Sequence, residues 1–378
     1  METTSGKAGK QNDYLPFMNK PSSLFKKAWQ QRLKKNKGAV FGLVMIFIAV
    51  FIAVFGYLLA PDSSPYANRI ILEIGGEKPG FTKSFLLVQK PVQQTSGFFS
   101  RLLYGKHDAY EHIPVQSWKE KGDSVVIQKY IDEEVSERMS FHKDTLAREP
   151  VVTKRFWLGS DKYGRDILSR LIIGTRISLS VGLITVAISL TIGIILGALA
   201  GYFSGRVDAV ITWLINVIWS IPTLLLVFAI TLLLGKGFWQ VFIAVGLTMW
   251  VNVARLVRGQ VLSAKELQYV EAAKVLGFSH FRIIGRHILP NILGPVLVIA
   301  ASNFASAIVI EAGLSFLGVG VQPPQPSWGL MIKENYNFII TQNPMLALAP
   351  GFAIMLLVLS FNLLGNGLRD ALNVRSKI

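Results

Sequence analysis

The sequence predicts an all-α polytopic membrane protein with six transmembrane helices and a small mixed α/β extracytoplasmic insertion between helices 1 and 2. Of its 378 residues, 51% are hydrophobic and only 16% are charged, a balance too apolar for an ordinary soluble domain. Charge-free runs of about 20 residues, the length that crosses a bilayer, recur along the chain. Lysine and arginine gather in connections that would share one side of the membrane.

Six charge-free runs are long enough to span the hydrocarbon. They lie between Lys37 and Asp62, between Arg176 and Arg206, between Asp208 and Lys236, between Lys236 and Arg255, from about Ile288 to Ile310, and from about Pro344 to Leu368. The first run is longer than the apolar core of a secretory signal and lacks a small-x-small cleavage site. We therefore expect it to stay in the protein as an anchor.

The basic residues indicate a membrane topology rather than a nucleic-acid surface. The segment before the first run, the connection between the fourth and fifth runs and the tail after the sixth hold 18 Lys or Arg and 5 Asp or Glu, which accounts for +13 of the formal net charge of +16. The opposite short connections carry only Lys236 and Lys333. Because Lys and Arg favour the cytoplasmic side, both termini are predicted to be cytoplasmic. The expected contact is membrane lipid, with no nucleic acid.

These patterns divide the chain into successive parts. They are a cytoplasmic N-terminal tail with an interfacial helix (1–37), transmembrane helix 1 (38–61), the extracytoplasmic insertion (62–176), a core of transmembrane helices 2–6 (177–368) with a cytoplasmic loop at about 255–287, and a cytoplasmic tail (369–378). Phe25, Trp29 and Leu33 recur every four residues among basic residues, which predicts a helix on the membrane surface. Met1 to Lys20 has the composition of a disordered tail.

The insertion is nearly balanced in charge, with 18 basic and 15 acidic residues between about Pro61 and Arg176. Runs rich in β-branched residues predict strands at 69–74, 84–89 and 124–131, and an acidic stretch predicts a helix at 132–139. Two interpretations are open for its aromatic and histidine side chains, a peptide path or a solvated spacer with a minor core. These side chains are Tyr104, His107, Tyr110 and Trp118.

The connection between the fourth and fifth runs has the most informative pattern. Good helix formers run from Glu266 to Leu276, and Gly277 suits the left-handed turn that ends a helix. Ser279 is then placed to cap a second short helix, and Pro290 to open the next span. One face of the first helix forms an apolar ridge, made by Tyr269, Val270, Ala273 and Leu276. With nothing expected inside the loop to bury it, this ridge predicts a partner's groove.

This connection resembles the EAA loop of bacterial ATP-binding-cassette import permeases. The matching residues are Glu271-Ala272-Ala273, Gly277 and Leu289-Pro290. The run from Arg286 to Asn291 is similar to the peptide and nickel branch, with His287 where the general pattern has isoleucine.

Further segments resemble the same branch. The stretch Trp157 to Asp166 is similar to its LGTDxxGRD segment through Gly159, Asp161, Gly164, Arg165 and Asp166. Leu314 to Gly318 and Pro326 to Gly329 resemble its LSFLGxG and PSWG stretches. The similarity covers about residues 24–62 and 156–372, in the C-type pattern of dipeptide and oligopeptide importers. The departure is the insertion, roughly 67–150, which is longer than usual.

The resemblance implies a type I importer permease fold that forms half of a translocation path for di- or oligopeptides in a bacterial inner membrane. The implied partners are a second homologous permease, one or two ABC ATPases and an extracytoplasmic solute-binding protein. No cofactor is expected on this chain, since ATP and Mg²⁺ would be bound by the ATPases. The implied ATPase-coupling surface is Tyr269, Val270, Glu271, Ala272, Ala273, Leu276 and Gly277.

Enzyme motifs are absent from the sequence. It has no G-x-x-x-x-G-K-[ST], H-E-x-x-H or G-x-S-x-G, and its five histidines lack metal-ligand spacing. Its lack of cysteine excludes thiolate chemistry. We therefore predict no catalytic residue, no metal site and no enzymatic activity.

Several alternatives stay open. Nickel chelates or other peptide-like cargo fit the same motifs. An ion-coupled secondary transporter needs an intramembrane acid, for which Glu311 is the candidate. A membrane enzyme or binding module would work through the insertion and would not need the EAA loop. Polar residues inside the spans do not single out a substrate path; they are Asn216, Ser220, Thr223, Asn252, Asn303 and Ser306.

Overall fold

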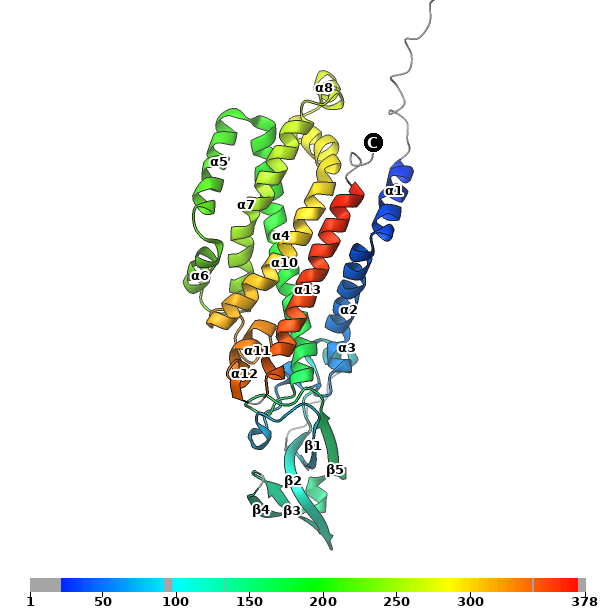
Figure 1. The fold of residues 1–378 in the computed structure, drawn as a ribbon, viewed down its shortest axis with the longest axis vertical. Helices are drawn as coiled ribbons and strands as arrows, with labels where there is room; N and C mark the ends of the chain where they lie inside the picture. The colour runs from blue at the N-terminus through cyan, green and yellow to red at the C-terminus, as the bar shows by residue number, and fades with distance from the viewer. Residues whose placement is uncertain (1–21, 92–96, 133, 342, 373–378) are drawn as a thin grey trace, which may run out of the picture.

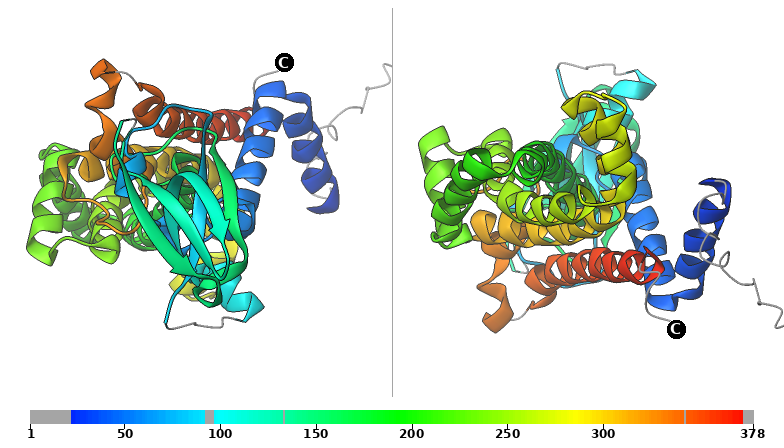
Figure 2. Two further views of the ribbon diagram at one scale, coloured as in Figure 1. Left: turned by 90° about the horizontal axis from the view of Figure 1, so that it is seen from below. Right: turned by 90° about the horizontal axis from the view of Figure 1, so that it is seen from above.

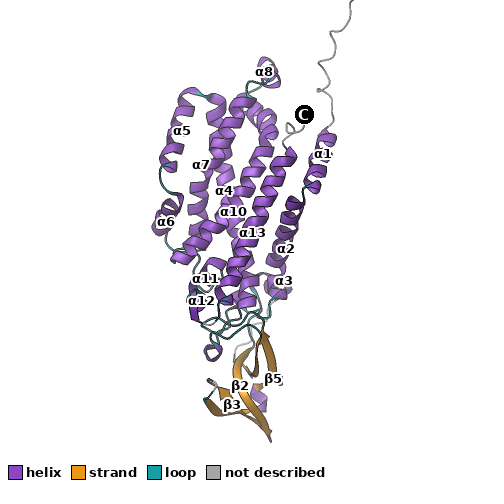
Figure 3. Ribbon diagram, viewed as in Figure 1, coloured by secondary structure: helices purple, strands orange, loops and turns teal. Residues whose placement is uncertain are grey.

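The computed structural model describes residues 22–91, 97–132, 134–341 and 343–372, which form an elongated helical bundle with a β-sheet at one end (Figure 1). Strands occur only at that end of the described chain, as the colouring by secondary structure shows (Figure 3). The predictions for residues 1–20 and 373–378 lie outside the described residues.

Five helices of the described chain are long and apolar enough to cross a membrane. They are α2 (Lys37–Leu59), α4 (Ile167–Phe203), α7 (Phe238–Ala264), α10 (Leu289–Leu317) with the helical turns before it, and α13 (Met345–Leu372). Four of them continue past a charged residue that bounds a predicted run, and among these α10 includes Glu311 and α13 includes Arg369 and Asp370. Helix α4 includes Arg170 and Arg176, and α7 continues past Arg255 and Arg258.

The predicted third span is not one straight helix. Residues 205–234 form α5 (Gly205–Trp219) and α6 (Thr223–Leu234), bent by 91° at the break between them. Pro222 occupies this break with φ −54° and ψ 123°, since proline lacks an N–H and disfavours the helical conformation in the residue before it. At 1.5 Å per residue each piece is about 18–23 Å long, too short to cross alone.

Helices α4 and α7 run side by side along a stripe of glycines. A Cβ built on Gly193 would lie 2.5 Å from the Cβ of Val253, and one on Gly197 would lie 2.5 Å from the carbonyl oxygen of Ala254. One turn further, a Cβ on Gly201 would lie 2.8 Å from the Arg258 oxygen. Small residues four apart let two membrane helices approach this closely. The two backbones therefore form the central pair of the bundle.

The remaining helices lie around this pair. Seen along the bundle axis, α1 (Ser22–Lys35) and α2 occupy one side and α5 the other (Figure 2). Gly42 of α2 and the Ser360 backbone of α13 are in close contact, and a Cβ on Gly42 would lie 2.4 Å from the Ser360 oxygen. The short helices are α3 (Phe98–Tyr104), α8 (Gln268–Val275), α9 (His280–Arg282), η4 (Ile283–Ile288), α11 (Trp328–Asn335) and α12 (Phe338–Thr341).

The insertion contains an antiparallel sheet with the strand order β4-β3-β2-β1-β5. Its strands are β1 (Phe81–Gln89), β2 (Tyr110–Lys121), β3 (Ser124–Tyr130), β4 (Ser136–His142) and β5 (Leu146–Phe156). The strands predicted at 84–89 and 124–131 lie in β1 and β3. The strand predicted at 69–74 is wrong, because this segment ends in a 3₁₀ turn at Leu72–Ile74. The helix predicted at 132–139 is also wrong, because Ser136–His142 pairs with β3.

Both faces of β1 are covered. Phe85 and Leu86 are neighbours that point to opposite faces, and both are fully buried. Leu86 packs in a cluster with Val115 and Ile127. Phe85 packs with Ile71 and Ile74 from the connection that follows α2. The sheet therefore shares an apolar core with the connection that leads out of α2.

Candidate functional site

The segment after α7 folds as a helix, a glycine turn and a second helix, as the sequence predicts. It projects from the end of the bundle opposite the sheet (Figure 1). Helix α8 is followed by Gly277 in the left-handed region with φ +75°. Ser279 then occupies the N-cap position of α9, and Pro290 lies in the first turn of α10. The backbone conformation at Gly277 is one that other residues adopt with strain.

Half of the apolar ridge predicted on α8 is buried, which corrects the argument that the loop has nothing to bury it. Val270 is 0% exposed and Ala273 is 3% exposed. They pack in a cluster that includes Ile283 and Ile288 of η4. The turn at Gly277 folds the following helix back onto α8, so the segment buries Val270 and Ala273 of its own ridge and leaves Leu276 exposed. These two residues form the base of the projection rather than its contact surface.

The outer surface of the projection is apolar and exposed. Val275, Leu276 and Phe281 are 88%, 71% and 75% exposed, values uncommon for large apolar side chains. Of the predicted coupling residues, Glu271 and Ala272 are also exposed. Tyr269 is at the margin, and its hydroxyl accepts a hydrogen bond from Asn291 Nδ2 at 3.1 Å. The exposed apolar surface of the projection therefore lies nearer to the glycine turn than the predicted ridge does.

The projection is fixed to the end of α4. Tyr202 Oη lies 3.0 Å from His280 Nδ1, and Lys265 Nζ donates to Ser204 Oγ at 2.6 Å. The rings of Phe278 and His287 stack with centroids 5.7 Å apart. A force on α8 would therefore reach α4 as well as α7 and α10.

The motif loop at 157–166 lies at the other end of α4. Gly159 and Gly164 have φ +81° and +73°. A Cβ on Gly159 would lie 2.2 Å from the Glu77 oxygen, and one on Gly164 would lie 1.7 Å from the Ile71 oxygen. Both glycines are needed because the backbone of the 71–79 segment passes directly over them. Asp166 then caps α4, accepting from Ser169 N at 2.8 Å.

Arg165 belongs to a buried ionic cluster that joins this loop to α11. Its Nε donates to Asp161 Oδ2 at 2.6 Å, and its Nη2 donates to Glu334 Oε2 at 2.8 Å. Arg170 Nη2 reaches the same Glu334 oxygen at 3.2 Å. The four side chains are between 0% and 10% exposed. The two arginines and two carboxylates balance in charge, as a buried cluster requires.

Leu289 and Pro290 make no comparable polar site. They open α10 directly after η4, and the neighbouring Ile288 is buried in the cluster beneath α8. The sequence motifs thus locate two separate places, the projection at one end of the bundle and the motif loop at the other.

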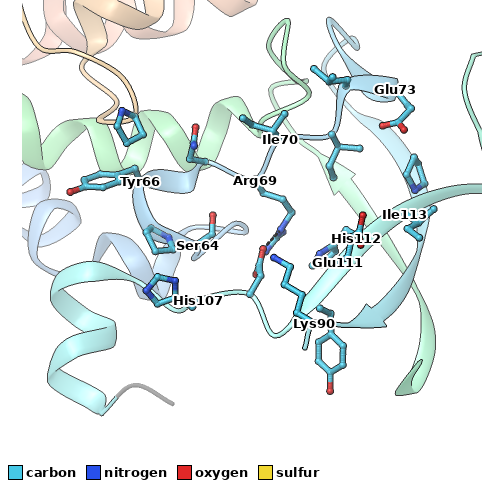
Figure 4. Close-up of a pocket in the computed structure, with 18 of the residues that line it drawn as sticks. Ser64, Tyr66, Arg69, Ile70, Glu73, Lys90, His107, Glu111, His112 and Ile113 are labelled. Atoms are coloured by element: carbon cyan, nitrogen blue, oxygen red, sulfur yellow. Dashed lines mark hydrogen bonds and ion pairs between the residues drawn. The ribbon is translucent and has the colours of Figure 1, made fainter. Parts of the chain in front are cut away.

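A groove of about 720 Å³ lies where the insertion meets the bundle (Figure 4). Arg69 is at its centre and donates to both oxygens of Asp108 at 2.6 Å, while its Nη2 lies 3.1 Å from Asp62. His107 and Tyr110 line this groove, as the interpretation of a peptide path through the insertion requires. Trp118 and Tyr104 are not among the lining residues.

His112, which lines this groove, lies against a lysine behind it. His112 Nε2 lies 2.9 Å from Lys154 Nζ. Burial, together with the positive charges of Arg69 and Lys154, lowers the pKa of His112 to about 3. Burial and Arg69 also lower the pKa of Lys154, to about 8. His112 is therefore neutral at pH 7 and accepts a hydrogen bond from the lysine.

Glu311, the candidate intramembrane acid, is fully buried near the end of α10. Its Oε1 accepts from Ser315 Oγ at 2.6 Å, and the same serine accepts from Val321 N at 3.1 Å. The carboxylate thereby helps to hold the loop after α10. Within the described residues, no group of three or more acidic or histidine side chains is placed to hold a metal ion.

Several residues of these sites were not predicted from the sequence. Glu334 and Arg170 stand far from each other in the chain, so no local pattern links them. The same holds for Asp108, which pairs with Arg69 across 39 positions.

Two family descriptions match the chain. "Binding-protein-dependent transport system inner membrane component" matches residues 193–378, and "N-terminal TM domain of oligopeptide transport permease C" matches residues 23–72. Among solved structures, the chain is similar to the inward-facing MetNI methionine ABC transporter, with 17% identity and a TM-score of 0.45 over 53% of this chain and 95% of that one.

Curated relatives are more similar in sequence. The chain is 42% identical to the glutathione transport system permease protein GsiD of Pectobacterium atrosepticum over 63% of this chain and 78% of that protein. It is 39% identical to the oligopeptide transport system permease protein OppC of Bacillus subtilis over 58% of this chain and 72% of that protein. Most of each relative is thus matched by this chain.

We predict that Glu334→Gln destabilises the protein by about 3–5 kcal/mol, because Arg165 and Arg170 lose the carboxylate that serves both of them. The measurement is the midpoint of thermal unfolding in detergent. Glu120→Gln is the matched control, since Glu120 pairs with Lys143 at 2.7 Å on the exposed sheet. That change should cost less than about 1 kcal/mol. Equal losses in the two variants would contradict the cluster's role.

We also predict that the insertion loses stability as the pH falls from 6.5 toward 3. The pKa of His112 is lower in the folded state than in the unfolded chain, so the unfolded chain binds more protons in this window. Protease sensitivity of the insertion at pH 7 and pH 5 measures the effect. In His112→Gln the increase on acidification should be smaller. An identical increase would show that carboxylates alone cause it.

Proposed function

Since this chain belongs to the family of binding-protein-dependent transport system inner membrane components, we propose that it forms half of the translocation path of an ATP-driven importer for di- or oligopeptides. It is a multi-pass inner-membrane permease of the type I importer class. The curated relatives are named as permeases for dipeptides, oligopeptides and glutathione, which supports a peptide substrate.

The observation that carries the proposal is the projection formed by α8 and the glycine turn. Its outer side chains Val275, Leu276 and Phe281 are exposed, while its base at Val270 and Ala273 is packed into the bundle. An apolar surface on a firmly seated helix suits insertion into a partner's groove. We propose that the partner is an ATPase, and that Glu271, Ala272, Leu276 and Gly277 belong to the contact.

We propose that this end of the bundle is cytoplasmic. The start of α1, the projection and the end of α13 lie at the same end, and the sheet lies at the other (Figure 1). The basic residues of the sequence concentrate in these three segments. The termini would then be cytoplasmic, the bent pair α5–α6 would complete a sixth span, and the insertion would be extracytoplasmic.

A second homologous permease would complete the path. Most of the polar residues noted within the spans are exposed in this single chain, namely Asn216, Ser220, Thr223, Asn252 and Ser306, whereas Asn303 is buried. Exposed polar groups in a membrane are unfavourable unless they face protein or water. They support an interface or a wet path rather than lipid contact.

The remaining partners follow from the family. We propose that one or two ATPase subunits bind ATP and Mg²⁺, that this chain needs no cofactor, and that an extracytoplasmic solute-binding protein delivers the substrate. ATP-driven closure of the ATPases would move the projection, and the packed helices would change the side of access as a two-state transition.

The first test is the uptake of labelled di- to hexapeptides by a strain that lacks this chain. We expect uptake to be lost in that strain and restored by the intact gene. Uptake of nickel chelates and of other peptide-like cargo is measured in parallel. If peptide uptake is unchanged and uptake of another cargo is lost, that cargo is the substrate class instead of peptides. The assignment of the chain as a permease would still hold.

The second test is Gly277→Val, which places a β-branched residue at φ +75°. The strain of about 1–2 kcal/mol should lower the equilibrium constant for forming the native turn about five- to thirty-fold, and ATP-driven uptake should fall. Membrane insertion should persist. Uptake and ATPase co-purification are both measured.

Gly259→Val is the matched control, because Gly259 lies in α7 with an ordinary helical backbone and open space around its Cβ position. It should transport normally. Normal uptake and normal ATPase binding in Gly277→Val would contradict coupling through this turn and would favour an ion-coupled transporter.

A further inference from the structure

Helix α3 lies in the insertion but exposes an apolar face. Phe98, Phe99, Leu103 and Tyr104 are 64%, 76%, 54% and 68% exposed, and no residue of the helix is buried. A soluble spacer rarely leaves two adjacent phenylalanines in water.

Arg176 of α4 fixes the position of α3. Its guanidinium donates to the carbonyl oxygens of Leu103 at 2.7 Å and Leu102 at 3.0 Å, which close the end of α3. The same guanidinium donates to the carbonyl oxygens of Ala53 at 3.0 Å and Val54 at 3.4 Å in α2. One side chain therefore fastens α3 to a membrane-spanning helix.

Two further contacts hold the end of α3. Gly105 has φ +85°, and a Cβ there would lie 2.8 Å from the Tyr57 ring of α2. Lys106 N donates to the Ser63 oxygen at 2.8 Å, just beyond the end of α2. The glycine is required because the chain must pass this closely over the tyrosine. Helix α3 thus has a fixed depth relative to α2.

The contacts of Arg176 place the end of α3 at the level of the apolar part of α2. Ala53 and Val54 lie five to six residues before the end of α2 at Leu59, which corresponds to about 8–9 Å along the helix axis. The apolar surface at this end of α2 is itself open, with Leu58 and Leu59 55% and 47% exposed. Figure 1 shows α3 beside the lower part of α2, above the sheet.

We propose that α3 is a membrane-interface anchor, whose aromatic face enters the lipid leaflet on the side of the sheet. Its exposed face continues the open apolar surface of a membrane-spanning helix, and short apolar helices rich in aromatic residues settle at the boundary of head groups and acyl chains. Arg176 is the positioning residue that sets the depth. The anchor would hold the insertion, and the groove beside it, at a fixed height above the bilayer.

The absence of cysteine from this chain gives a direct test. Phe99→Cys is labelled with an environment-sensitive fluorophore in the assembled transporter in nanodiscs, and Lys119→Cys, exposed on β2, is the control. Quenching by a phospholipid with a nitroxide near its head group is compared with quenching by aqueous iodide. We expect the Phe99→Cys probe to be quenched by the lipid and protected from iodide several-fold relative to the control.

Two results would overturn the proposal. Iodide quenching equal to that of the control would place this face in water. Protection from both quenchers would show that another protein, such as a second permease or a solute-binding protein, covers it. Neither result depends on which substrate is transported, so failure here is distinct from failure of the peptide assignment.

A second variant tests the role of Arg176. Arg176→Gln combined with Phe99→Cys should lose most of the lipid quenching, because α3 is no longer fastened to α2. Arg155→Gln, an exposed arginine of β5, is the matched control and should leave the quenching unchanged. Full lipid quenching in Arg176→Gln would overturn the assignment of depth to this residue.

Discussion

The close contact between α4 and α7 is the interaction on which the rest of the bundle depends. In lipid, apolar side chains gain little by moving from acyl chains to another apolar surface, so helices associate through close packing. The glycines at 193, 197 and 201 permit that packing by bringing the two backbones together. The pair then supplies the surfaces against which α10 and the base of α8 are buried.

Helix α4 also connects the two places that the sequence motifs mark. It begins in the ionic cluster of Arg165, Arg170 and Glu334, and it ends with Tyr202 packed beneath the projection. Its 37 residues extend about 55 Å. A buried ionic cluster resists partial displacement, because separating one partner leaves an unpaired charge. Movement at the projection would therefore reach the insertion end as a displacement of a whole helix.

The sequence predicted the apolar centre of each long helix but not its ends. Charge ended the predicted runs, whereas Arg170, Arg176 and Arg258 lie within helices because each finds acceptors from distant segments, such as Glu334 and Asp208. The glycine turn at Gly277 was predictable, since one residue type suits a left-handed backbone. Burial of Val270 was not, because it depends on how η4 folds back. The motif glycines were recognised by resemblance alone; their close contact with residues 71–79 is visible only in three dimensions.

The insertion can be long without changing the motif loop at 157–166, because the insertion contacts this loop only near the bundle. Gly159 and Gly164 touch the 71–79 segment, and Arg165 reaches Asn68 and Glu334. None of these residues lies in β2, β3 or β4, which form the outer part of the sheet. The junction nevertheless depends on β3 as well as on β1 and β5, because Lys129 Nζ lies 2.9 Å from Glu73 Oε1 and Tyr130 packs in the cluster that holds Ile71 and Ile74.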